Sequence, residues 1–195
     1  MSIVRVNPES VSNYGNTASQ QFERMRGELE QLTREVVAVR YFGPNAQQFK
    51  TKSGELAVTF ANALMNDLNS IAEAVRQSTS NIAASLGGRA VTINFNGAPL
   101  PPPEVPAPTD FVDVDTSALE QLRPVVTARF AALEEALQQH LTALERTDWE
   151  GQAKQGAVEA VNRFTVSARG KASEAQNDLN QTIEQQISAV VSADR

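Results

Sequence analysis

The stretch "DWEG", residues 148–151, contains Trp149, the only tryptophan of the 195-residue chain. A second aromatic-x-glycine triplet, "YFG" at residues 41–43, lies in the first half of the sequence. On both sides of each triplet, apolar side chains recur at steps of three and four residues, which is the spacing of one face of an α-helix. Glycine permits backbone conformations that end a helix, and Pro44 starts a new helix well but continues one badly. Each triplet is therefore predicted to be the turn of a helical hairpin.

The shift that places Tyr41 on Trp149 aligns the two halves of the chain without a gap. It also brings together the turn glycines, Gly43 with Gly151. Apolar positions in the flanking helices match as well: Val11 with Leu119, Phe22 with Phe130, Leu29 with Leu137, Val36 with Leu144, Ile71 with Leu179 and Ile82 with Val190. Two unrelated amphipathic helices can match by chance, but not usually together with both turns, so a duplicated hairpin is the better interpretation.

The segment between the hairpins has a different composition. "AVTINFNG", residues 90–97, alternates apolar and polar side chains as a short strand would. "APLPPPEVPAP", residues 98–108, holds six prolines and cannot be helical. We therefore predict an all-α protein in which a first helical hairpin (residues 1–87) and a second (114–195) are joined by an extended proline-rich linker (88–113).

The two hairpins are predicted to pack as an antiparallel four-helix bundle. In that arrangement the first hairpin ends at the opposite end of the bundle from the start of the second, so the linker must span the bundle. At roughly 3.1 Å per residue, a polyproline-like linker of this length reaches about 85 Å, which exceeds a bundle of ~50 Å. A domain-swapped homodimer could use the same linker, and both assemblies remain open.

Composition and charge narrow the classes of function. The chain has no cysteine, which excludes disulfides, thiolate metal sites and cysteine nucleophiles. Its formal net charge of −6 argues against nucleic acid as a partner, because phosphate binding draws on clustered Lys and Arg. No apolar run reaches the roughly 18 to 20 residues of a membrane-spanning helix. The start "MSIVRVNPES" lacks the regions of a cleavable signal peptide, so we expect a protein made in the cytoplasm without one.

Catalytic and metal-binding chemistry is not expected. A catalytic site needs a nucleophile with a base, or a cluster of metal ligands, held together in a pocket. His140, the only histidine, falls one residue before the apolar stripe position Leu141, and we interpret it as a histidine at the rim of the bundle or partly buried. No glycine-rich phosphate loop is present. The sequence therefore predicts no catalytic residue, no cofactor and no metal, and a protein that is not an enzyme.

The two hairpins resemble the WXG-motif family, early-secretory-antigen-like helical hairpins that are substrates of type VII (ESX) secretion systems. The resemblance covers residues 3–86 and 111–192 as two fused copies. In that family the Trp-x-Gly triplet lies in the hairpin turn, as Trp149, Glu150 and Gly151 are predicted to do. "YFG" looks like a degenerate copy of it. Because family members usually pair as dimers, the resemblance implies a tandem mimic of such a pair.

The resemblance implies a non-enzymatic type VII secretion substrate or adaptor that is secreted or displayed at the cell surface. Its partners would be the type VII machinery or another helical-hairpin protein. Exported pairs often carry a carboxy-terminal Tyr-x-x-x-Asp/Glu signal, which this sequence lacks, since its only tyrosines are Tyr14 and Tyr41. Another signal, or a partner that carries one, is then required. The alternatives are a membrane-active, pore-forming protein of the same family, for which membrane contact is possible but not expected, and an intracellular helical scaffold.

Two roles are open for the turn motifs, which comprise Tyr41, Phe42, Gly43, Trp149, Glu150 and Gly151. An aromatic ring at a tight helix-helix turn can cap the end of the apolar core, with the glycine allowing close approach or positive φ. An exposed aromatic there can instead be a docking point for secretion machinery or lipid. Packing is the favoured interpretation for Trp149, and one residue can serve both roles.

Overall fold

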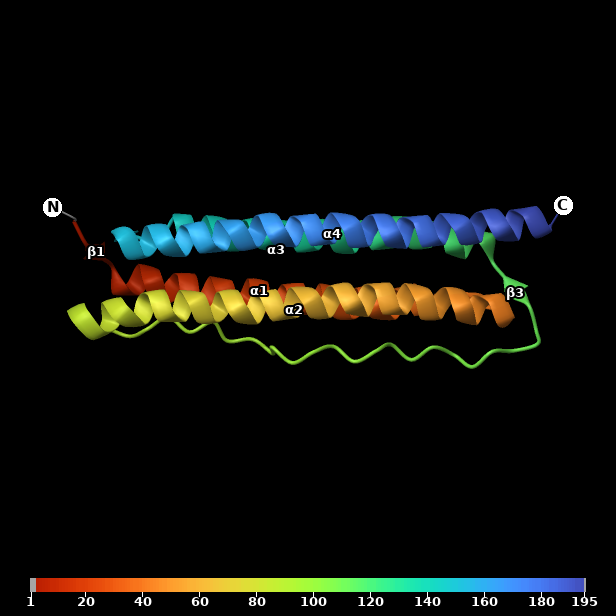
Figure 1. Ribbon diagram of the computed structural model, residues 1–195, viewed down its shortest axis with the longest axis horizontal. Helices are drawn as coiled ribbons and strands as arrows, with labels where there is room; N and C mark the ends of the chain where they lie inside the picture. The colour runs from red at the N-terminus through yellow and green to blue at the C-terminus, as the bar shows by residue number, and fades with distance from the viewer. Residues whose placement is uncertain (1–2, 195) are drawn as a thin grey trace. The chain divides into compact units, whose positions relative to one another are not determined.

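The computed structural model describes residues 3–194, apart from the side chains of Ser85 and Leu86. Helix α1 spans Pro8–Ala38 and α2 spans Pro44–Leu86, while α3 spans Thr116–Glu145 and α4 spans Gln152–Ala193. One chain supplies all four helices, which pack as a bundle through the pairs α1 with α2, α1 with α3, α2 with α4 and α3 with α4 (Figure 1). The predicted all-α fold of two helical hairpins in a four-helix bundle is confirmed.

Four two-residue strands accompany the helices. β1 (Arg5–Val6) precedes α1, β2 (Tyr41–Phe42) lies in the first turn, β3 (Asp113–Val114) precedes α3, and β4 (Trp149–Glu150) lies in the second turn. β1 pairs antiparallel with β4, and β2 pairs antiparallel with β3. The strand before each hairpin is thus held by the turn of the other hairpin. The sequence pattern did not predict these strands.

The internal repeat is visible in every element of the structure. The shift that places Tyr41 on Trp149 also places the first residues of β1, α1 and α2 on those of β3, α3 and α4. The helix caps follow the same rule. The side-chain oxygen of Asn7 accepts the backbone N–H groups of residues 9 and 10, as that of Asp115 accepts those of residues 117 and 118. Both are Asn or Asp at an N-cap, where such a side chain satisfies otherwise unpaired helix donors.

Contacts divide the chain into two compact units, and each unit takes part of every helix. Unit 1 consists of Met1–Arg26, Leu64–Ala98 and Leu133–Arg169. Unit 2 consists of Gly27–Ala63, Pro99–Ala132 and Gly170–Arg195. In unit 1 the start of α1 therefore lies with the end of α3, which is the antiparallel arrangement of the hairpins. Both hairpins, as bounded by the sequence, contribute to both units.

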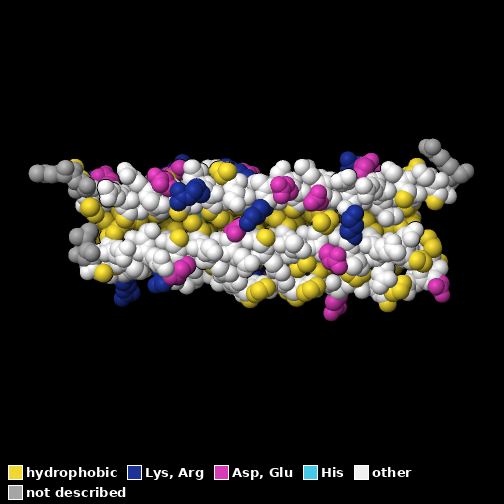
Figure 2. Space-filling view, viewed as in Figure 1, with side chains coloured by type: hydrophobic (Ala, Val, Ile, Leu, Met, Phe, Trp, Pro, Cys, Tyr) yellow, Lys and Arg dark blue, Asp and Glu magenta, His cyan; other side chains and the backbone are white. Residues whose placement is uncertain are grey.

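The core of unit 1 is built from the predicted apolar stripes. Side chains from all four helices are buried there, among them Ala18, Phe22, Met25, Leu64, Leu68, Val75, Leu133, Leu137, Val161 and Ala168. On the face drawn in Figure 2, apolar side chains gather in a seam between helices, and charged side chains lie beside this seam and in places across it. Arg169 of α4 pairs with Glu134 of α3. The 3.6-residue periodicity thus predicted correctly which helix faces are buried.

Unit 2 has a comparable core and a partly buried ion pair. Phe60 of α2 packs against Phe130 of α3 with ring centroids 5.3 Å apart and the rings tilted to each other. Arg129 of α3 binds two carboxylates of α1, Glu28 at 2.8 Å and Glu35 at 2.9 Å. These hydrogen bonds raise the pKa of the Arg129 guanidinium. The guanidinium and both carboxylates are mostly shielded from solvent, so this clamp joins the two hairpins more firmly than an exposed ion pair.

The linker corrects one prediction in unit 1. Residues 90–97 form no strand, although Val91 and Ile93 are buried as their alternation implied. Helix side chains, rather than a neighbouring strand, satisfy the backbone. The N–H of Val91 donates to Thr79 Oγ1 at 2.9 Å, and buried Arg26 donates to the carbonyls of residues 96 and 98. A strand needs a partner strand, and this segment lies on helices that offer side-chain groups only.

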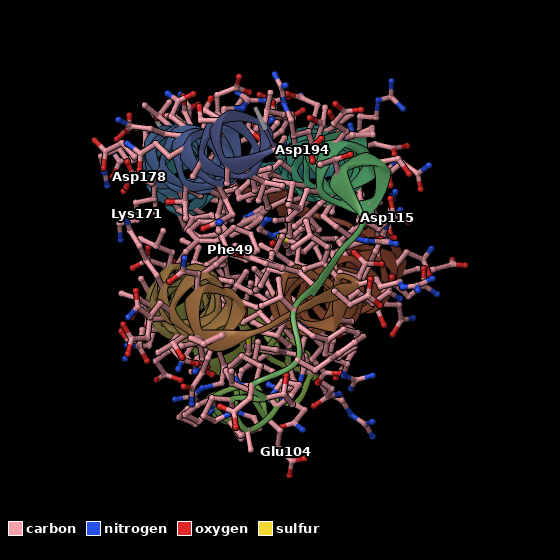
Figure 3. The ribbon with its side chains drawn as sticks, turned by 90° about the vertical axis from the view of Figure 1, so that its right-hand side faces the viewer. Phe49, Glu104, Asp115, Lys171, Asp178 and Asp194 are labelled. Carbon is pink, nitrogen blue, oxygen red and sulfur yellow. The ribbon has the colours of Figure 1, made fainter. Side chains whose placement is uncertain are left out.

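In unit 2 the linker continues as the predicted extended, proline-rich segment without regular structure. Buried Leu100 is fixed at both backbone groups by Asn62 of α2, whose side chain accepts its N–H at 2.7 Å and donates to its carbonyl at 3.2 Å. Gly54 of α2 leaves room for Pro103. Figure 3 shows Glu104 pointing outward from the linker, whereas Phe49 points from α2 in among the helices.

Candidate functional site

The second turn motif lies in unit 1 and buries its tryptophan. Trp149 is 2% exposed, and its backbone N–H donates to the Thr147 carbonyl at 2.8 Å. In the β1–β4 pair Trp149 faces Val6, and Glu150 faces Arg5. The Glu150 side chain is exposed. Trp149 therefore packs at the end of the core, which is the favoured one of its two predicted roles, and it offers no exposed ring for docking.

Gly151 completes this turn in a conformation that favours glycine. Its φ is +126°, and a Cβ at this position would contact the Ile3 carbonyl oxygen and the Val4 side chain at 3.6 Å. The segment before β1 can therefore lie directly against the turn. Ile3 and Val4 themselves are 75% and 53% exposed.

The first turn motif lies in unit 2 and repeats this geometry. Tyr41 is 4% exposed and pairs with Val114 of β3. Gly43 has φ +127°, and a Cβ there would lie 3.3 Å from Val112 Cγ2. The Tyr41 hydroxyl accepts a hydrogen bond from Gln186 Nε2 at 2.8 Å, while burial raises its pKa. The "YFG" triplet is thus a complete structural counterpart of "WEG".

The two turns differ in what they show to solvent. The middle residue of the first turn is Phe42, 38% exposed, where the second has an exposed carboxylate, Glu150. Phe42 lies beside buried Lys50, whose Nζ is 5.0 Å from the ring centroid and whose pKa is lowered by burial. The residues before the strands do not add to this difference, because Phe111 and Val112 are exposed much as Ile3 and Val4 are. The first turn is therefore the more apolar of the two.

The turns also differ in one buried polar atom. Whereas the Tyr41 hydroxyl is bonded to Gln186, the indole Nε1 of Trp149 is buried and has no hydrogen-bond partner among the described residues. An indole N–H is a donor only, so it lacks an acceptor in this structure.

His140 is the clearest departure from the sequence prediction. It is not at the rim, because its exposure is 0% and it lies in the core of unit 1. Its Nε2 lies 2.8 Å from the Tyr14 hydroxyl, and its ring is edge-on to Phe22 with centroids 4.9 Å apart. The repeat itself carried the signal, because the counterpart of His140 is Leu32, a residue of the buried stripe.

Burial controls the protonation of this pair. Desolvation lowers the pKa of His140 to about 4 and raises the pKa of Tyr14 far above its usual value. The histidine is therefore neutral near pH 7, with one ring nitrogen facing the phenol. Its Nδ1 is buried without a partner in the described part of the chain.

Two further features bear on the possible chemistry. Among residues 3–194 no group of three or more His, Asp or Glu side chains is placed to hold a metal ion. None of the four helices, as far as they are described, is long and apolar enough to cross a membrane.

Comparison with family models, curated proteins and solved structures found no match to this chain. The function must therefore be inferred from the duplicated hairpin and the two turns themselves.

Proposed function

We propose that this protein is a non-enzymatic type VII secretion substrate or adaptor, a single chain that takes the place of a WXG-type dimer. The observation that carries the proposal is the duplicated turn. Two aromatic-x-glycine motifs recur at the same place in the two hairpins, each with a buried aromatic and a glycine at positive φ. Each turn is also held by the strand that precedes the other hairpin.

This crosswise pairing ties the two hairpins to each other at both turns. In a pair of separate chains, each turn would be completed by the partner chain, and here the other half of the same chain completes it. A fused protein of this kind is assembled as soon as it folds. Recognition by secretion machinery then depends on side chains exposed around the turns, above all Phe42 and Glu150, because Trp149 and Tyr41 are buried.

The experiment is export from a host that has a type VII system, with and without its secretion ATPase. A tagged wild-type chain should reach the culture supernatant only when the ATPase is present. Phe42→Ala and Glu150→Ala should reduce export, and Val166→Ala is the matched control because Val166 is 61% exposed on α4 and belongs to neither turn motif. Trp149→Ala is a poor test, since it also leaves a cavity in the core.

Each outcome separates parts of the proposal. A supernatant amount that is the same without the ATPase, or a chain that stays in the cell in both strains, refutes the secretion function. Export that needs the ATPase but is equal in all three variants keeps the substrate function and refutes recognition through the turns. Melting curves measured on the purified variants confirm that reduced export does not reflect unfolding.

A further inference from the structure

We propose that unit 1 contains a binding site for a small amphipathic carboxylate, a molecule with one anionic head and an apolar body. The site is a cavity of about 580 Å³ lined by the start of α1, the end of α2, linker residues 87–92, Asn94 and Trp149. Its volume lies within the range of small-molecule pockets in proteins, roughly 300–1,000 Å³.

The cavity depends on the linker between the two hairpins. Helices α1 and α2 have counterparts in α3 and α4, and the linker that follows α2 returns over the helices (Figure 1). Gly15 of α1 admits this return, because a Cβ there would lie 3.0 Å from Val91 Cγ1. Its counterpart in unit 2 is Arg123, an exposed residue that pairs with Glu184. The cavity is therefore a feature added to the duplicated scaffold.

Trp149 forms one wall of this cavity and is 2% exposed. Its indole N–H, which has no hydrogen-bond partner in the described structure, is itself buried, so the ring meets the cavity with its carbon atoms. The tryptophan therefore contributes apolar surface to the site, and the head of a ligand must be recognised by other residues.

The charges of the lining residues favour an anion. In a chain with a formal net charge of −6, the described residues that line the cavity include one cation, Arg89, and no Asp or Glu. Arg89 is exposed and forms no ion pair with the described residues. The first turn of α1 contributes Pro8 and Val11 to the lining, and the amino-terminal end of a helix favours negative charge. The guanidinium suits a carboxylate head.

The remaining walls suit an apolar body. Val11, Ile82, Ala83 and Val91 line the cavity, with small polar side chains such as Ser12 and Thr92 between them. The wall thus mixes apolar and polar surface, and sites for small organic ligands likewise combine apolar side chains with polar groups that orient the ligand. A straight-chain carboxylate such as decanoate combines the two properties, so we choose it as the probe.

The test is calorimetric titration of the full chain with decanoate below its micelle concentration, with the emission of Trp149 followed in parallel. We expect saturable binding with one site per chain and a change in tryptophan emission. Decanol, which has the same body without the charge, should bind at least about tenfold more weakly, because hydrogen bonds to charged groups are the stronger ones. Arg89→Gln should weaken decanoate binding by about tenfold without affecting folding, since Arg89 is exposed.

The repeat supplies matched controls for the site. Ala83→Phe fills the cavity and should abolish binding, whereas Val191→Phe, at the equivalent position of α4, should leave it unchanged. The proposal is overturned if decanoate shows no saturable binding at millimolar concentration, or if Ala83→Phe and Val191→Phe bind it equally. Equal affinity for decanoate and decanol overturns the assignment of a carboxylate.

Discussion

Replacing the buried Tyr14–His140 pair by leucines should make the protein markedly less sensitive to acid. The double variant Tyr14→Leu with His140→Leu is the appropriate change, because removing only the histidine leaves the Tyr14 hydroxyl buried and unpaired. The chain already carries this combination in unit 2. There the equivalent positions are Leu122 and Leu32, and both are buried.

The magnitude follows from the protonation of His140. The unfolded chain binds a proton at this side chain below its ordinary pKa of 6.5, whereas the folded protein does so only below about 4. As pH falls between these values, the unfolded state takes up a proton that the folded state excludes, so the free energy of unfolding decreases. A difference of this size corresponds to about 3 kcal/mol at ~1.4 kcal/mol per pKa unit. Stability from this residue is therefore fully present above pH 6.5 and is lost as pH falls toward 4.

The assay is urea denaturation of both proteins, followed by far-ultraviolet circular dichroism, at a series of pH values between about 7 and 4. The carboxylates are common to both proteins, so their contribution cancels in the difference. We expect the double variant to gain about 3 kcal/mol relative to wild type across this range, whatever the difference at neutral pH. A difference that does not change with pH would refute a buried, neutral His140.

Three further predictions concern the scaffold. Gly151→Ala and Gly43→Ala should each lower the free energy of unfolding by about 1 to 3 kcal/mol, because the φ angles of these glycines are positive. Gly27→Ala, in the interior of α1 with open space around it, should instead raise the free energy of unfolding by up to about 1 kcal/mol. Chemical denaturation measures all three variants. Gly15→Arg introduces the residue found at the equivalent position 123 and should displace the linker from unit 1. Limited proteolysis within residues 88–98 should then become faster. Unchanged cleavage would count against the described contact between Gly15 and Val91. Arg129→Ala should lower the free energy of unfolding by about 1 to 3 kcal/mol, because it leaves Glu28 and Glu35 shielded and unpaired. The control is Arg163→Ala, which removes an exposed pair with Glu159 and should change stability by less than about 0.5 kcal/mol. Equal losses in these two variants, measured by urea denaturation, would count against the clamp.

The helices and their buried faces were predictable because they depend on periodicity over many residues. Phe22 and Phe130 occupy matching places in two long stripes, and both are buried. The turns were predictable for a different reason, since Gly43 and Gly151 interrupt those stripes at equivalent positions. Both kinds of signal are local in the sequence.

What could not be predicted depends on contacts between distant parts of the chain. A two-residue strand such as Arg5–Val6 has no periodicity, and only its pairing with Trp149–Glu150 makes it a strand. Alternation in residues 90–97 correctly indicated burial of Val91, but not that helix side chains would satisfy the backbone. His140 was misplaced by counting along a single helix, where one residue shifts a side chain by about 100°.

Of the candidate site, the sequence located the residues but not what each exposes. The triplets place Trp149 and Tyr41 at turns, yet only the fold shows that both rings are buried and that Phe42 and Glu150 face solvent. The cavity beside Trp149 was beyond sequence reasoning, because it arises where the linker returns to α1 and α2.

The crosswise pairing of strands and turns has a consequence for dilution. Two separate hairpins would dissociate when their concentration falls below their dissociation constant. Joined by residues 88–113, they meet at an effective local concentration set by the tether, of the order of millimolar for a flexible connection, however dilute the protein becomes. A protease that cuts the linker would turn this concentration-independent assembly into an ordinary equilibrium between two chains. The fused protein is therefore suited to places where a two-chain complex would come apart.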